Sequence, residues 1–218
     1  YEGGLYSLFS TVGVAATAFL MIFYPAISKR INRKPLMNRM VVISTVGYVL
    51  MILSRIIPAA GFLLLTIGYM ISNFGLYSYY LIMMISIINT VEYNEYKTGD
   101  RNEAIIASAR PLITKMSSAL IVVMTTATYM IFGVTNYTNQ ISDLESASAA
   151  GLITDAEKLA AIEGVIQGVD PAQTWGLLIL MVVVPYAMML LSNGLYQNHY
   201  KLDEAEYERI CKELEARR

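Results

Sequence analysis

The chain has 218 residues, of which 56% are hydrophobic and only 15% are charged, and its formal net charge is −1. A soluble globular domain carries about 25% charged residues, so this composition favours a membrane protein. The near-neutral charge gives no indication of nucleic-acid binding. One histidine and one cysteine, Cys211, leave no basis for a disulfide framework, a metal site or a cofactor site.

Five long apolar segments predict about five transmembrane helices in an all-α integral membrane fold. They cover residues 4–27, 40–57, 61–91, 104–132 and 174–198. Crossing ~30 Å of hydrocarbon takes about 20 helical residues, and the third segment is long enough to tilt or to project beyond the membrane. We therefore predict a transmembrane bundle over residues 1–199. The sequence does not begin with Met and shows no signal-peptide pattern, so we expect a piece of a longer protein.

The charges between these segments predict the orientation of the bundle. Of the 16 Lys and Arg residues, five lie between the first and second spans and five in the tail, while Lys97 and Arg101 lie between the third and fourth spans and Arg110 lies in the first turns of the fourth. Only Arg55, Lys115 and Lys158 lie elsewhere. Basic residues collect in cytoplasmic loops. This places the N-terminus outside and the C-terminal tail in the cytoplasm, as an odd number of crossings requires.

Residues 134–173 form a predicted external insertion with a helix start inside it. Thr154 and Glu157 match the capping-box pattern T-x-x-E. The helix that this box opens should end near Gly168, and we interpret it as a solvated surface helix.

The tail, residues 200–218, is predicted to form an amphipathic helix on the cytoplasmic face. Asp203 can cap it, and Glu208–Lys212 and Glu213–Arg217 are favourable i,i+4 pairs. An apolar stripe runs along one side of this helix, formed by Tyr207, Ile210, Cys211 and Leu214.

Lys115 is the sharpest functional candidate. If its span starts at Ala104, Lys115 lies ~16 Å along the helix, where an unpaired ammonium is costly in a bilayer. Its default interpretation is therefore a functional group that faces the bundle interior. The alternative is a span that begins at Leu112, with Lys115 extending to the headgroups.

Polar and aromatic residues recur at helical spacing on three of the spans. Such stripes predict a shared wet cavity, and a lining of this kind suits sugars, whose hydroxyls need hydrogen-bond partners and whose ring faces pack on aromatic rings. Small residues can equally mark close helix packing, and Tyr24, Tyr137 and Trp175 fit an aromatic belt at the membrane surface. The stripes are Tyr6, Ser10, Gly13 and Thr17; Tyr69, Asn73, Tyr77, Tyr80 and Met84; and Ser108, Lys115, Ser118, Thr125 and Tyr129.

The segment 91–103 concentrates charges of both signs beside the membrane, including Glu92, Glu95 and Arg101. Such charges can form a network that breaks and re-forms during alternating access, or an ordinary solvated loop. No catalytic motif such as H-E-x-x-H, Walker A or G-x-S-x-G occurs, so we do not expect an enzyme.

The run from Glu92 to Glu103, E-Y-N-E-Y-K-T-G-D-R-N-E, followed by Ser108 and Lys115, resembles the glycoside–pentoside–hexuronide:cation symporters of the major facilitator superfamily, of which melibiose permease is the familiar member. The tail pattern from Tyr200 to Arg217 is also similar to that family. The chain departs from melibiose permease at Arg110-Pro111, at Asn89 and in the long external insertion, which leaves the identity of the sugar open.

The resemblance implies helices eight to twelve of a twelve-helix fold in a bacterial inner membrane. It implies that Lys115 takes part in sugar and cation handling, that Tyr80 lines the sugar site, and that Glu92, Glu95 and Arg101 contribute to a cytoplasmic gate. Tyr77, Asn73, Ser108 and Ser118 are our further pathway candidates. The coupling cation, Na⁺ or H⁺, would bind mainly to the N-terminal half of the same transporter, which this chain lacks.

We therefore predict secondary active transport of a sugar or glycoside by alternating access. One rival is a major-facilitator exporter of other small molecules, which predicts a more apolar lumen and no need for Lys115. Another is a membrane scaffold or sensor subunit, which predicts that Lys115 tolerates replacement and the tail does not. A third is a dimer of 218-residue chains.

Overall fold

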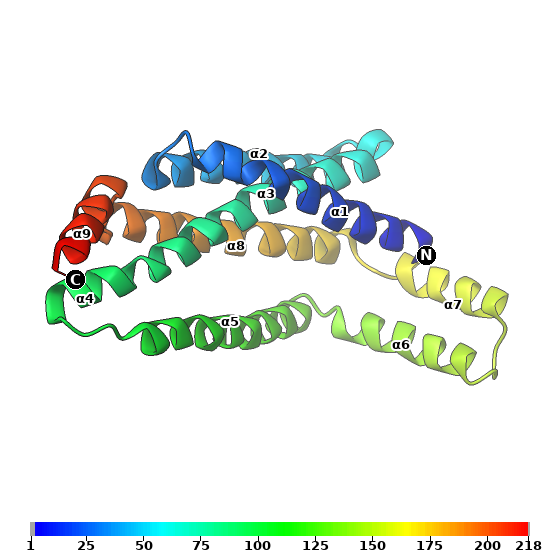
Figure 1. The fold of residues 1–218 in the computed structure, drawn as a ribbon. Helices are drawn as coiled ribbons and strands as arrows, with labels where there is room; N and C mark the ends of the chain where they lie inside the picture. Colours follow the sequence, from blue (N-terminus) through cyan, green and yellow to red (C-terminus); the bar gives the residue numbers. More distant parts are fainter. Residues whose placement is uncertain (1–2, 218) are drawn as a thin grey trace. The chain divides into compact units, whose positions relative to one another are not determined.

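The computed structural model describes residues 3–217, apart from the side-chain surroundings at positions 3, 6, 16, 19 and 20 (Figure 1). Over this range every regular element is helical and no strand forms, which confirms the predicted all-α fold. The elements are α1 Gly3–Ser28, α2 Arg33–Ile56, the short 3-10 turn Pro58–Ala60, α3 Gly61–Ile88, α4 Thr90–Thr98, α5 Glu103–Ile131, α6 Thr135–Ala149, α7 Asp155–Gln167, α8 Pro171–His199 and α9 Glu204–Arg217.

Four helical stretches in the described part of the chain are long and apolar enough to cross a membrane. They are Arg33–Ile56, Pro58–Thr98, Glu103–Ile131 and Pro171–His199, which match the second to fifth predicted spans. The first predicted span, 4–27, coincides with the 26-residue helix α1. That α1 crosses the membrane stays a prediction.

Two of the predicted boundaries differ from the structure. Helix α2 begins at Arg33 rather than Met40, so Arg33, Lys34 and Arg39 lie within its first two turns and not in a loop. Lys and Arg are good helix formers, and their long stems carry the charge from a helix end to the surface. The third predicted span, 61–91, is interrupted at Asn89, where α3 ends and the short helix α4 begins.

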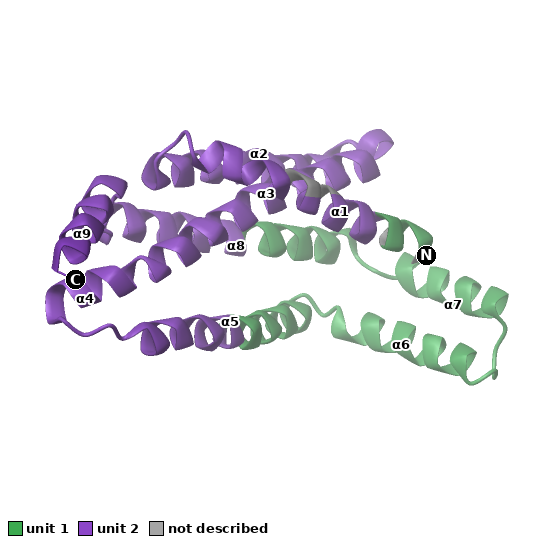
Figure 2. Cartoon of the chain, viewed as in Figure 1, with its two compact units in different colours: residues 1–8, 117–183 green, residues 9–116, 184–218 purple. Residues whose placement is uncertain are grey.

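The chain forms two compact units, which are coloured separately in Figure 2. The smaller unit is Tyr1–Leu8 with Ser117–Val183, and in it α6 packs against α7. The predicted capping box is confirmed: Thr154 Oγ1 accepts a hydrogen bond from Glu157 N at 3.3 Å, and Glu157 Oε2 accepts one from Thr154 N at 2.8 Å. Helix α7 ends at Gln167 with Gly168 as its cap, as predicted.

The larger unit, Phe9–Met116 with Val184–Arg218, contains a tight hairpin of α2 and α3. The two backbones approach closely at glycine and serine. A Cβ atom at Gly47 would lie 2.4 Å from Ser72 N, and one at Gly75 would lie 2.7 Å from Met40 O. The buried Ser44 hydroxyl donates to Ser72 O at 3.3 Å. Small residues allow membrane helices to pack in this way without a hydrophobic driving force between them.

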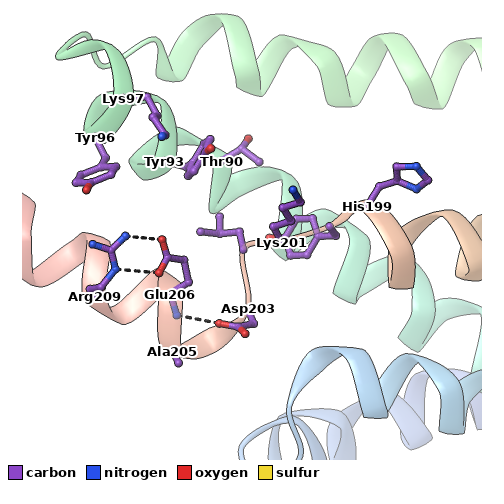
Figure 3. Close-up of a pocket in the computed structure, with 12 residues that line it drawn as sticks. Thr90, Tyr93, Tyr96, Lys97, His199, Lys201, Asp203, Ala205, Glu206 and Arg209 are labelled. Carbon is purple, nitrogen blue, oxygen red and sulfur yellow. Dashed lines mark hydrogen bonds and ion pairs between the residues drawn. The ribbon is translucent and has the colours of Figure 1, made fainter.

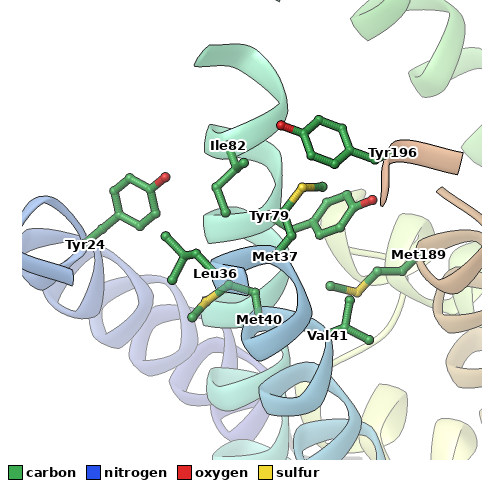
Figure 4. Close-up of a cluster of buried hydrophobic side chains, with 9 residues drawn as sticks. All are labelled: Tyr24, Leu36, Met37, Met40, Val41, Tyr79, Ile82, Met189 and Tyr196. Atoms are coloured by element: carbon green, nitrogen blue, oxygen red, sulfur yellow. The ribbon is translucent and has the colours of Figure 1, made fainter. Parts of the chain in front are cut away.

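Side chains of α1, α2, α3 and α8 form the buried core of the larger unit (Figure 4). Hydroxyl groups link α8 to the hairpin at three levels: Tyr79 to Ser192 at 2.8 Å, Thr45 to Tyr186 at 2.9 Å and Ser86 to Tyr196 at 2.8 Å. Such bonds satisfy polar groups that lipid cannot solvate. The core residues are Tyr24, Leu36, Met37, Met40, Val41, Tyr79, Ile82, Met189 and Tyr196.

The assignment of Tyr24 to an aromatic belt is wrong. Its side chain is only 7% exposed and belongs to the core, on the side of Leu36 in Figure 4. A tyrosine near a span end fits both environments by sequence position. Here the neighbouring helices cover its ring and remove it from the lipid surface.

Candidate functional site

Helix α3 has a packed face and an open face. The packed face carries small and apolar residues that are buried, such as Ser72, Gly75 and Ile82. The open face carries Tyr77 and Tyr80, which are 50% and 39% exposed. Tyr77 and Tyr80 of the predicted stripe therefore lie away from the surface that packs on α2, as a cavity lining requires, whereas Tyr69 packs on Phe9 of α1.

Tyr80 and Lys115 line one cavity of about 740 Å³ within the larger unit, which we call the Lys115 cavity. Helices α3 and α5 supply most of its wall. Apolar side chains make up most of the lining, and a few polar and charged groups are available to bind a ligand. Its lining residues are Tyr80, Met84, Ile87, Ile88, Val91, Glu103, Ile106, Ala107, Arg110, Pro111, Thr114 and Lys115.

Helix α5 places Lys115 far from either of its ends. The helix runs without a break from Glu103 to Ile131 and includes Pro111, so Lys115 lies ~18 Å along it from Glu103. Within the described residues Lys115 forms no ion pair. A charge at this depth needs a partner or water, and the structure leaves its ammonium group open to the cavity.

Arg110 is a second cation in the same cavity, and the sequence analysis did not assign it a site. We counted it there among the cytoplasmic charges and named it with Pro111 as a departure from melibiose permease. Its position in the predicted span 104–132, five residues before Lys115, was the available signal.

A second cavity, of about 340 Å³, lies between α1 and α3, and Tyr80 borders both cavities. Asn73, Tyr77 and Tyr69 from α3 face Thr17 from α1 there. The structure thus brings together Tyr80, Tyr77 and Asn73 from the predicted sugar pathway.

Three other stripe residues lie elsewhere. Ser108 is exposed on α5, donates to Ile105 O at 2.7 Å, and is absent from the lining of the Lys115 cavity. Ser118 belongs to the smaller unit. Gly13 is a packing residue, because a Cβ atom there would lie 2.5 Å from the ring of Tyr69.

Arg101 lies in the segment between α4 and α5 and interacts with three carboxylates, two from α4 and one from α5. Its guanidinium nitrogens lie 3.1 Å from Glu103, 3.2 Å from Glu95 and 3.7 Å from Glu92. The hydrogen bond that Arg101 Nε donates to Glu103 and the charges of all three acids raise the pKa of Arg101. Glu92 Oε2 is buried and has no hydrogen-bond partner in the described part of the molecule. The predicted association of Glu92, Glu95 and Arg101 is therefore present, with one acceptor still free.

The tail helix α9 docks on α4, and the predicted cap and stripe are confirmed. Asp203 Oδ1 accepts from Glu206 N at 2.9 Å, and Ile210 and Leu214 are buried with Leu202. Arg217 lies over the ring of Tyr96, 4.9 Å from its centroid. Of the two predicted i,i+4 pairs, Glu213–Arg217 forms at 3.8 Å, whereas Glu208–Lys212 does not form in the described helix.

Glu204, the first residue of α9, also binds the start of α2. Its Oε1 accepts from the backbone N of Arg33 at 2.7 Å and from Arg33 Nε at 2.8 Å. Asn32 makes no side-chain cap for α2, so a residue from the far end of the chain supplies the negative charge that a helix N-terminus favours. Burial acts to raise the pKa of Glu204, but the hydrogen bonds from Arg33 prevail and hold it below its ordinary value.

Apolar helices that enclose polar, aromatic and cationic side chains in cavities are the architecture of a multi-pass membrane transporter. The chain belongs to the MFS/sugar transport protein family, whose pattern matches residues 2–204. This match and the relatives described next confirm the predicted resemblance to sugar symporters of the major facilitator superfamily.

Three relatives illustrate the similarity. The chain is 32% identical to the lactose permease of Leuconostoc lactis over 99 residues, or 44% of this chain and 14% of that permease. It is 23% identical to the raffinose carrier protein of Pediococcus pentosaceus over 210 residues, or 96% of this chain and 28% of that carrier. It is 23% identical to the uncharacterized symporter YnaJ of Bacillus subtilis over 209 residues, or 96% of this chain and 38% of that protein.

The chain spans less than two fifths of the length of each of these relatives. All three are described as transporters rather than enzymes, in agreement with the sequence analysis.

Proposed function

We propose that this chain is part of a secondary transporter that carries a sugar or glycoside across the bacterial inner membrane, coupled to Na⁺ or H⁺. The observation that carries the proposal is the Lys115 cavity, where a tyrosine ring and an ammonium group face one hollow. A pyranose ring packs on an aromatic face, and its hydroxyls require polar partners. The names of the relatives, a lactose permease and a raffinose carrier, support a sugar as the cargo.

In this proposal the two cavities that share Tyr80 form one wall of the sugar pathway. Tyr80 stacks on the sugar, and Tyr77 and Asn73 supply hydrogen bonds further along α3. The opposite wall comes from an N-terminal half of the same transporter, since the chain spans only a fraction of its relatives.

Lys115 couples sugar and cation in this proposal. Its ammonium group is far from the ends of α5 and has no partner in the described residues, so a carboxylate of the N-terminal half can neutralise it. Binding of Na⁺ or H⁺ to that carboxylate would weaken the pair, and the freed Lys115 would then interact with the sugar.

Arg101 with Glu92, Glu95 and Glu103, which we call the Arg101 cluster, acts as the cytoplasmic gate. It lies between two helices of membrane length, and the basic residues near it favour the cytoplasmic side. The free acceptor Glu92 Oε2 offers a hydrogen bond to a donor of the other half when the gate closes. Rocking of the halves would make and break that bond during alternating access.

The test is uptake of labelled glycosides and hexuronides by membrane vesicles that contain the complete transporter. Natural protein, Lys115→Ala and the control Lys29→Ala are compared with and without imposed sodium or proton gradients. Lys29 is exposed in the loop after α1, so its replacement tests for a general effect of lost charge. We expect gradient-driven uptake of one sugar class that is lost in Lys115→Ala and retained in Lys29→Ala.

The rival functions give different results. If the protein is an exporter or a scaffold, vesicles that contain the well-folded natural protein will show no gradient-driven sugar uptake. Unchanged uptake in Lys115→Ala would remove Lys115 from the coupling mechanism.

A further inference from the structure

A third cavity, of about 890 Å³, lies where α4, the end of α8 and the start of α9 meet, and we call it the tail cavity (Figure 3). It belongs entirely to the larger unit and is distinct from the Lys115 cavity. Because α8 is a candidate membrane span that ends at His199, the tail cavity lies at the level where that helix leaves the membrane. Its lining is Thr90, Tyr93, Tyr96, Lys97, His199, Tyr200, Lys201, Leu202, Asp203, Ala205, Glu206 and Arg209.

Two ammonium groups in this lining have no carboxylate of the described residues within ion-pair distance, although the charge of Lys97 acts on Glu206 from further away. Lys97 and Lys201 are exposed and form no ion pair within the range that the structure describes. The Lys97 Nζ atom lies 5.8 Å from the centre of the Tyr93 ring, and Figure 3 shows both side chains at the same edge of the cavity. Lys97 comes from α4, and Lys201 comes from residues 200–203, which we call the α8–α9 link. Two charges that are remote in sequence therefore line the same cavity.

The acids of the lining already have partners. Glu206 is held by two bonds from Arg209, with Nε at 2.8 Å from Oε2 and Nη2 at 2.5 Å from Oε1. Asp203 caps α9 through Glu206 N, and both interactions are drawn in Figure 3. Arg209 also donates to Glu213, outside the lining, at 2.6 Å. Within the lining itself, Lys97, Lys201 and Arg209 face two carboxylates, so the lining has an excess of one positive charge.

Neutral groups add further hydrogen-bonding capacity. The Tyr93 hydroxyl has no hydrogen bond to any described residue. His199 Nδ1 lies 3.1 Å from Leu195 O, which leaves Nε2 available. Lysines surrounded by hydroxyl and imidazole groups suit a compact anion with several acceptor oxygens, and a phosphate group presents three.

We propose that the tail cavity binds a phosphate group, through Lys97 and Lys201 with help from Tyr93. The phosphate can belong to the headgroup of an anionic phospholipid or to a soluble phosphorylated metabolite, because both present the same chemistry to the two lysines. A bound phosphate bridges α4 and the α8–α9 link, and so fastens the tail helix beside the Arg101 cluster. This proposal does not depend on the cargo or on the coupling cation.

The experiment measures thermal unfolding of the complete transporter in nanodiscs. One arm compares discs of phosphatidylcholine with discs that contain phosphatidylglycerol. The other arm adds inorganic phosphate, with sulfate as the comparison, to the phosphatidylcholine discs. The variants are Lys97→Gln/Lys201→Gln, Tyr93→Phe, and the matched control Lys212→Gln, which removes an exposed lysine of α9 outside the cavity.

We expect one arm to raise the unfolding temperature of the natural protein and of Lys212→Gln. The double variant should lose this rise, because its dissociation constant for the probe should increase about tenfold or more. Tyr93→Phe should lose a smaller part of the rise. A response to phosphatidylglycerol assigns the site to a lipid headgroup, and a response to phosphate assigns it to a soluble ligand. The proposal is overturned if neither probe stabilises the protein, or if the double variant responds like Lys212→Gln. Size-exclusion chromatography in plain discs checks that the variants fold.

Discussion

Replacing Gly47 by alanine tests whether the α2–α3 hairpin depends on backbone contact. The added Cβ would lie 2.4 Å from Ser72 N and 2.7 Å from Gly68 O, whereas ordinary contact begins at 3.4 Å. The atoms in the way are backbone atoms, which cannot rotate aside. The two helices must therefore separate by about 1 Å, a gap that forfeits up to about half of the attraction between facing atoms.

The size of the effect follows from two contributions. Forcing a methyl group into a packed contact costs about 1–3 kcal/mol. Separation also weakens the buried hydrogen bond from Ser44 to Ser72, and a bond of this kind contributes about 0.6 kcal/mol in a membrane protein. We expect Gly47→Ala to lower the free energy of unfolding by about 1–3.5 kcal/mol relative to a matched glycine change.

Gly194→Ala provides that match, because Gly194 is also in a helix but a Cβ there meets no atom within 4 Å. Both Gly→Ala changes increase helix propensity by the same amount. The difference between the two unfolding free energies therefore reports the contact of α2 with α3 at Gly47. The assay is unfolding in mixed micelles with increasing SDS, followed by circular dichroism. Equal unfolding midpoints for the two variants would refute the conclusion that Gly47 sets the distance between α2 and α3.

Three further predictions concern the hydrogen bonds. Because Arg33 lowers the pKa of Glu204, docking of α9 should be stable above the ordinary value of 4.5 and weaken as the pH falls through the lowered pKa. Hydrogen exchange of α9, corrected for intrinsic rates, should rise in acid for the natural protein, and be high at every pH in Glu204→Gln. Thr154→Ala should destabilise the first turn of α7 by about 1 kcal/mol, seen as faster exchange confined to that turn. Tyr79→Phe removes a bond to α8 and should lower the SDS midpoint by less than Gly47→Ala, consistent with about 0.6 kcal/mol.

The features that the sequence predicted well are those decided within one helix. The capping box of Thr154 and Glu157 joins residues three positions apart, and so does the bond of Asp203 to Glu206 N. The stripe with Ile210 follows from helical periodicity alone. Local chemistry settles these cases whatever the rest of the chain does.

The features that the sequence did not predict depend on contacts between distant segments. Tyr24 is buried because α2 and α3 cover it, and the sequence around Tyr24 contains no sign of this. Arg110 lines the Lys115 cavity because α5 lies opposite α3 there. The pair of Arg33 and Glu204 joins residues 171 positions apart, and nothing in either neighbourhood indicates the other.

The Arg33–Glu204 pair also bears on how the protein is made. Synthesis adds about 5–20 residues per second, so the ribosome completes Glu204 on the order of 10 seconds or more after Arg33. During that interval α2 and α3 can already form their hairpin, because they are adjacent in sequence, while the N-terminus of α2 still lacks its carboxylate. Helix α9 is therefore made well after the hairpin, and its Glu204 completes the N-terminus of α2. A chain that ends before Glu204 can still form the hairpin, but the N-terminus of α2 then lacks this carboxylate.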